Sequence, residues 1–157
     1  MSSIRSLLGL LEEGFQRRAW HGTNLLGSIR GLSPAAAAWR PAPGRHNIWE
    51  LIVHCAYWKY AVTRQLTGAK PGSFAYQGSN FFERNRGTRA DLARDVALLK
   101  RCHAELVAAV KRVKPAQLGK KPAGGKWTRQ RSIVGAAFHD TYHTGQIQLV
   151  KRLRNRK

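Results

Sequence analysis

Acidic residues are scarce in this sequence. Only 8 Asp and Glu stand against 28 Lys and Arg, which leaves a net charge of +20. This imbalance makes nucleic acids, membrane headgroups and acidic ligands candidate partners. Cysteine is also scarce: Cys55 and Cys102 are the only two, and neither belongs to a CxxC pair. Two such residues exclude a disulfide framework, so we expect both to behave as small buried hydrophobic side chains.

Long apolar runs and strand patterns are missing as well. No stretch of eighteen apolar residues occurs, which excludes a membrane-spanning helix of ordinary composition. Glu12 and Glu13 stand where a signal peptide requires an apolar run, so we expect a cytoplasmic protein with no membrane partner. No segment alternates β-branched and polar residues over the length of a strand. The 157 residues, 43% of them hydrophobic, suffice for one core, and we predict a single all-α domain over residues 1–157.

Apolar residues recur at steps of three and four along most of the chain, which is the period of a buried helix face. Asn47 with Glu50, and Thr88 with Asp91, form capping-box patterns that mark helix starts. Gly31 with Ser33-Pro34 marks the end of the first helical region. The predicted helical regions are 3–30, with a break at 21–23 where Thr23 caps a new helix, 47–67, 88–114 and 130–153. With a long irregular connection over about 68–87, they predict a four-helix bundle with one crossover loop between helices two and three.

Three histidines interrupt otherwise apolar helix faces. His54 lies in the stripe of Leu51, Trp58 and Ala61, while His139 and His143 lie in that of Ala136, Ile147 and Val150. Residues four apart share one side of a helix, so the last two imidazoles can bind one ion, with His54 as third ligand from a facing helix. Each buried imidazole without a partner costs about 1–3 kcal/mol, which one shared ion removes. The alternative is that hydroxyls or carbonyls satisfy each histidine at the edge of the core.

The segments HNIWELIVHCAYWKY and HDTYHTGQI together resemble the DinB-like superfamily of bacterial four-helix bundles. The similarity extends from about Trp20 to Leu153. It implies that His54, His139 and His143 bind a divalent metal, nickel or zinc. It further implies an enzyme acting on a small-molecule substrate, either a transferase or isomerase that uses a low-molecular-weight thiol, or a hydrolase, because three protein ligands leave one metal position open.

Three further polar residues are candidates for the surroundings of this metal. Glu50 lies one turn before His54 and is a candidate base or hydrogen-bond acceptor, although its capping box explains it fully. Gln146 is a candidate for reaching the open metal position, against a simple interhelical hydrogen bond. His103 occupies a core position on the third long helix, where a hydrogen bond at the edge of the bundle is the alternative. Asp140 and Tyr142 are expected to hold neighbouring helices.

Two other functional classes stay open. The first is a non-catalytic basic module that binds nucleic acid and keeps a structural metal, with Lys151–Lys157 and the loop around Trp127 as its basic regions. The loop and the tail lie roughly 30 Å apart along one helix, so we expect only weak, salt-sensitive polyanion binding. Trp127 is a candidate for base stacking, although packing is favoured. The second is a scaffold that dimerises through an exposed helix face, and we expect a homodimer. Trp20, Trp39 and Trp49 are candidates for that face, with core packing as their default.

Overall fold

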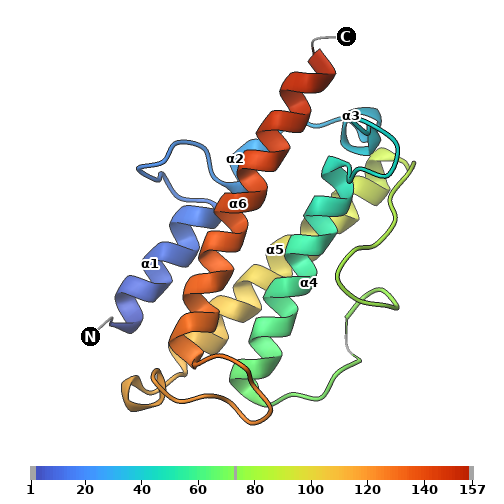
Figure 1. Cartoon of the computed structure of the whole chain (residues 1–157). Helices are drawn as coiled ribbons and strands as arrows, with labels where there is room; N and C mark the ends of the chain where they lie inside the picture. Colours follow the sequence, from blue (N-terminus) through green and yellow to red (C-terminus); the bar gives the residue numbers. More distant parts are fainter. Residues whose placement is uncertain (1–2, 73, 156–157) are drawn as a thin grey trace.

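The computed structural model describes residues 3–72 and 74–155, and in this part of the chain every regular element is helical (Figure 1). The only β feature there is an isolated bridge between Ala19 and Gly22. The all-α prediction is therefore confirmed. The elements are α1 (Ile4–Phe15), α2 (Leu25–Ile29), α3 (Pro34–Ala38), α4 (Ile48–Thr67), α5 (Arg89–Lys111), the short 3-10 helix Pro115–Gln117 and α6 (Arg129–Asn155).

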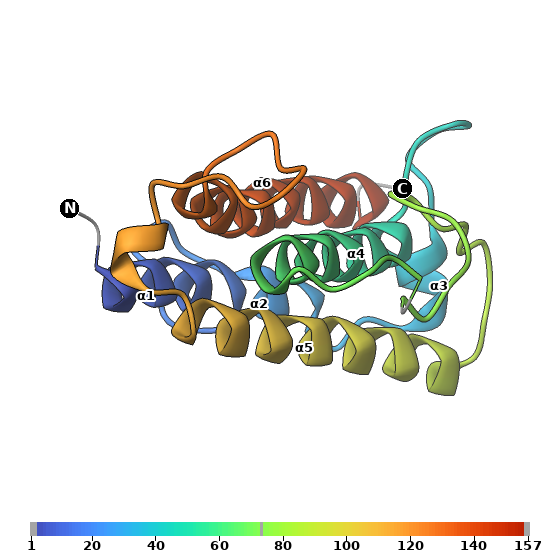
Figure 2. The same cartoon turned by 90° about the horizontal axis from the view of Figure 1, so that it is seen from below.

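The core lies where α1, α4, α5 and α6 pack against one another. α4 contacts both α5 and α6, and α1 contacts α6 and α5, so each long helix has two long neighbours (Figure 2). One apolar cluster includes Trp49, Ile52 and Leu99, and a second includes Leu11 and Ile133. Cys55 and Cys102 are buried free thiols, as expected. None of the described helices combines the length and apolar character needed to cross a membrane.

Local capping signals place the start of the two central helices correctly. The Asn47 side chain accepts a hydrogen bond from the Glu50 amide, and the Glu50 carboxylate accepts one from the Asn47 amide. Thr88 and Asp91 form the same reciprocal pair at the start of α5. α4 ends at Thr67 and is capped by Gly68, whose φ of 73° is the left-handed conformation that glycine adopts without steric cost.

The N-terminal region departs from its prediction. α1 ends at Phe15, and the break covers 16–24, because the amides of Gln16 and Arg17 both donate to the Glu12 carbonyl and close the helix early. Asn24, and not Thr23, caps α2, and its side-chain amide also donates to the Arg17 carbonyl at 2.7 Å. Asn24 thus stabilises the loop, because its side chain bonds forward to the start of α2 and back to the Arg17 carbonyl.

Two further corrections concern segments outside the central helices. Ser33-Pro34, interpreted as a helix end, begins α3: the Ser33 hydroxyl accepts from the Ala36 amide, and Pro34 occupies the first turn, where its missing N–H is harmless. Trp20, for which core packing was the default, is 100% exposed, whereas Trp49 is buried and donates its indole N–H to Asp95.

The segment between α4 and α5 runs back along the length of α4, so that α5 begins beside the start of α4 (Figure 1). It contains no helix among its described residues. Phe82, in this segment, is buried in the larger apolar cluster. The segment therefore forms part of the core and lies against the face of α4 that carries His54.

Candidate metal centre

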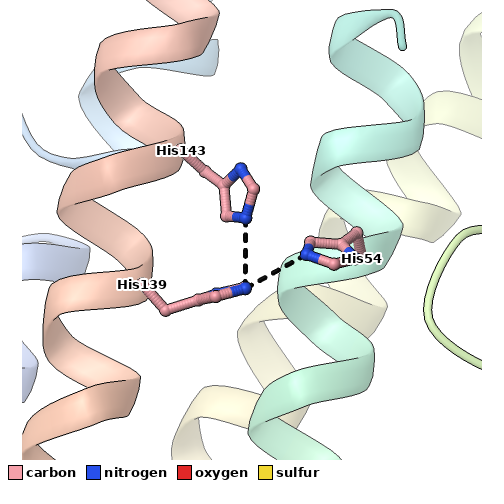
Figure 3. Close-up of side chains that lie close together, drawn as sticks. All are labelled: His54, His139 and His143. Atoms are coloured by element: carbon pink, nitrogen blue, oxygen red, sulfur yellow. Dashed lines mark hydrogen bonds between the residues drawn. The ribbon is translucent and has the colours of Figure 1, made fainter.

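The structure brings the three predicted ligand histidines together between α4 and α6 (Figure 3). His54 projects from α4, and His139 and His143 project from successive turns of α6. The Nε2 atom of His139 lies 3.1 Å from Nε2 of His54 and 3.1 Å from Nε2 of His143. His54 and His143 are 5% exposed. Three imidazole nitrogens thus converge on one point at the edge of the core.

The opposite nitrogens of two of these rings show which nitrogen carries the proton. Nδ1 of His54 lies 2.9 Å from the carbonyl oxygen of Asn80, and Nδ1 of His143 lies 2.7 Å from Oε1 of Gln146. Both partners are acceptors, so each Nδ1 carries the hydrogen and each Nε2 presents a lone pair. The Gln146 amide nitrogen donates to the Tyr142 hydroxyl at 3.1 Å, which keeps Oε1 directed at His143.

Hydrogen bonds among the three imidazoles cannot satisfy this arrangement. A neutral His139 has at most one hydrogen on Nε2 and can donate to only one of the two lone pairs that face it. A cation between the three nitrogens removes the remaining repulsion between lone pairs. A tetrahedral zinc ion with bonds of about 2.0–2.1 Å spaces its ligand nitrogens about 3.3 Å apart, close to the 3.1 Å observed here. The donor set therefore fits a divalent metal that accepts imidazole ligands.

Burial keeps the three imidazoles neutral at pH 7. It lowers the pKa of His54 to about 4, with a smaller contribution from the neighbouring His143. It lowers the pKa of His139 to about 3, with help from the other two rings, and it also lowers the pKa of His143. Because a metal competes with protons for the same nitrogens, rings that are already deprotonated favour metal binding at neutral pH.

The three histidines form one wall of a cavity of about 750 Å³. Its other walls are mainly apolar and aromatic, with a few polar groups, and no Asp or Glu occurs among the described residues that line it. A volume of this size accommodates a small organic molecule. The lining includes Leu51, Trp58, Asn80, Phe81, Tyr142, Gln146 and Leu149.

Two residues of the segment between α4 and α5 complete the site, and the sequence analysis missed both. Phe81 stacks between His46 and His54, with ring centroids 3.6 and 4.0 Å away. Asn80 binds His54 through its backbone carbonyl and accepts a hydrogen bond from the Trp58 indole through its side chain, at 3.0 Å. Its φ of 67° is uncommon outside glycine, but asparagine tolerates it. An Asn in a long irregular segment was the only signal available.

Glu50 and His103 do not join the histidine group. The Glu50 carboxylate is bound by Arg40 and His46 and by the amide of its own cap. Burial raises the pKa of Glu50, but hydrogen bonds from Arg40 and His46 outweigh this effect and lower it. Nε2 of His103 lies 3.3 Å from Oε1 of Glu12 on α1, so its partner is a carboxylate outside the histidine group.

The predictions for Gln146, Asp140 and Tyr142 have different outcomes. The Gln146 side chain bonds to His143 and Tyr142 on its own helix and lines the cavity, so its role at an open metal position stays a prediction. Asp140 does hold neighbouring helices, through an ion pair with Lys59 of α4. Tyr142 does not: it is 64% exposed and lines the cavity, so that prediction is wrong.

Ligand atoms of Cys55, His139 and Asp140 also lie within 4.8 Å of one another. This second group is a poor metal site. Complete burial raises the pKa of the Cys55 thiol well above its usual value, so the thiolate that a metal needs is disfavoured. The Asp140 carboxylate is already bound to Lys59.

Comparison with known proteins identifies the family. A family model for the DinB superfamily matches residues 17–147. The chain belongs to the DinB superfamily. No curated protein matches it. A crystal structure of a conserved protein from Enterococcus faecalis has the same fold, with a TM-score of 0.64 and 22% sequence identity over 100% of this chain and 99% of that chain. The resemblance carried by the two histidine segments is thus confirmed for the DinB family, and the geometry described above is where this member could hold a metal ion.

Proposed function

We propose that this DinB-superfamily protein is a metal-dependent enzyme. In this proposal a four-helix bundle, with a crossover connection between its second and third long helices, uses His54, His139 and His143 to bind one divalent ion, zinc or nickel. The observation that carries it is the convergence of three Nε2 atoms whose lone pairs cannot all be satisfied by hydrogen bonds to one another.

The surroundings favour a catalytic site over a structural one. Structural zinc sites are closed by four protein ligands, whereas three ligands leave a position for water or substrate. Here the histidines border a cavity of about 750 Å³, which offers room for such a ligand. A bound divalent ion would make a coordinated water or thiol acidic near neutral pH, which is the chemistry of a hydrolase or of a thiol-dependent transferase or isomerase.

The residues around the imidazoles have separate tasks in this proposal. Asn80 and Gln146 fix the tautomers of His54 and His143 by accepting their Nδ1 hydrogens. The Tyr142 hydroxyl accepts from Gln146, which leaves its own hydrogen free to donate to a ligand in the cavity. Phe81 covers the ring of His54 and limits the access of water to it.

Metal analysis of the untagged protein tests this proposal. We expect about one equivalent of zinc or nickel after equilibration with the ion and gel filtration, and its loss in His139→Ala and in His143→Ala. His21→Ala is the matched control, because His21 is exposed and lies outside the site. Full metal occupancy in both site variants would refute the assignment.

A further inference from the structure

A second cavity, of about 370 Å³, lies between α4 and α6 on the other side of His139. Trp58 and His139 line both this cavity and the larger one. Their ring centroids are 6.3 Å apart. The hydrogen bond from the Trp58 indole to Asn80 holds the tryptophan at this boundary. A ligand in the second cavity therefore lies next to one of the three imidazoles of the proposed metal site.

The outer wall of the second cavity carries an exposed tryptophan with cations beside it. Trp127, for which packing was the favoured prediction, is 44% exposed. The Arg131 guanidinium lies 4.0 Å from the centroid of its ring, and Nζ of Lys126 lies 5.1 Å from it. Trp58, on the facing helix, is 39% exposed. Two indoles and a guanidinium thus border one small cavity.

The charge of this cavity is unbalanced. None of the described residues that line it is Asp or Glu, and no ion pair joins Arg131 to a carboxylate in the described part of the chain. Lys59 also lines the cavity, but its ammonium group is bound to Asp140. Among the described residues that line the cavity, Arg131 is therefore the cation available to a ligand. It lies in the first turn of α6, where the helix dipole also favours an anion.

From these contacts we propose that the second cavity, bordered by Trp58, Trp127 and Arg131, binds a small carboxylate with a planar apolar body. Indole rings stack on planar groups, and a guanidinium binds a carboxylate through two parallel hydrogen bonds. The volume suits a single small molecule. This inference rests on the proposed function in one respect. If the protein is the proposed enzyme, the carboxylate is one of its two reactants, and the larger cavity binds the other.

Binding of 2-naphthoate to metal-free protein, measured by calorimetry, tests the cavity without depending on the metal. We expect 2-naphthoate to bind at least tenfold more tightly than the neutral 2-naphthamide, because only the carboxylate pairs with Arg131. Arg131→Gln removes that charge and the guanidinium contact with Trp127, and it breaks no side-chain hydrogen bond to a described residue. We expect about a tenfold or greater loss of naphthoate affinity. Arg152→Gln, an equal charge change further along α6, is the matched control and should leave the affinity unchanged.

A blocking variant locates the ligand. Gly135 lines the cavity, and a Cβ added there would meet no atom within 4 Å outside its own stretch of helix, so we expect Gly135→Leu to occupy the cavity while the helix is kept. We expect it to abolish naphthoate binding and to leave the metal content unchanged. Unchanged naphthoate affinity in Gly135→Leu, or an equal loss in Arg152→Gln, would overturn the inference.

Two more outcomes separate the alternatives. Displacement of 2-naphthoate by a dT12 oligonucleotide at physiological salt would overturn the proposal in favour of nucleic-acid binding. Absence of metal, combined with naphthoate binding that needs Arg131, would overturn the proposed enzyme and support the cavity. The two proposals therefore fail separately.

Discussion

Replacing Lys59 by methionine would leave the Asp140 carboxylate without its cation in the core. Lys59 is 2% exposed and Asp140 is 0% exposed, and their ion pair joins α4 to α6. Oδ1 of Asp140 has no hydrogen-bond partner among the described residues, so the Lys59 ammonium is the main group that compensates this charge. The Lys59 ammonium also lies 4.8 Å from the centroid of the Phe15 ring.

Removing one partner of a buried pair costs about 3–5 kcal/mol, whereas replacing both with apolar residues of similar volume is often neutral. We therefore expect Lys59→Met to lower the free energy of unfolding by about 3–5 kcal/mol and the melting temperature by roughly 10 °C or more. The double variant with Asp140→Leu should recover most of that loss. Urea unfolding at pH 7, followed by circular dichroism, measures the stability of the unchanged protein, the single variant and the double variant, all in the metal-free state.

The pH dependence gives a second check on this pair. Burial raises the pKa of Asp140 even beside Lys59, and removing the lysine raises it further. The folded state then holds the proton more tightly than the unfolded state, so the variant loses stability as the pH rises. We expect Lys59→Met to be more destabilised at pH 8 than at pH 5. A cost below about 1 kcal/mol at pH 7 would show that Asp140 is not an unpaired buried charge, and the reasoning would be wrong.

Three other variants, at two residues, test local interactions in the fold. Burial, with Lys59 nearby, lowers the pKa of His103 to about 4, so the metal-free protein should lose stability as the pH falls from 6.5 toward 4, where only the unfolded imidazole takes up a proton. In His103→Phe this pH-dependent loss of unfolding free energy should be smaller by on the order of 3 kcal/mol. Urea unfolding at pH 6.5 and pH 4 measures it, and a loss as large as that of the unchanged protein would contradict the lowered pKa. Asn80→Gly and Asn80→Ala both remove the hydrogen bond from the Trp58 indole, which should lower the free energy of unfolding by about 1 kcal/mol. Alanine should cost about 1 kcal/mol more, because of the φ of 67°, and equal urea stability of the two would contradict that strain.

The parts of the fold that were predictable depend on interactions within a few residues. The capping boxes at Asn47 and Thr88 join residues three apart, and both helices begin where those pairs predict. By contrast, α1 ends early because two amides share the Glu12 carbonyl, and Asn24 closes the loop by bonding to Arg17, seven residues away. Neither interaction can be recognised from the spacing of apolar residues in the sequence.

The burial of the tryptophans was likewise not predictable from local sequence. Core packing was the default prediction for both Trp49 and Trp20, yet Trp49 is 1% exposed and Trp20 is 100% exposed. A tryptophan adds the same apolar area in both places, and only the packing of distant elements decides whether water is removed from it. Trp127 belongs with Trp20 in this respect, and its exposure is what makes the second cavity available.

The sequence by itself determined the helical class and the pairing of His139 with His143, because an interval of four residues places both rings on one side of any α-helix. It also indicated His54, through an apolar stripe and the DinB resemblance. Only the tertiary structure decided that Asn80, Phe81 and the Lys59–Asp140 pair surround these rings. Their contacts join residues 26 to 81 positions apart, and such contacts depend on how whole helices and the connecting segment pack, which no local pattern encodes.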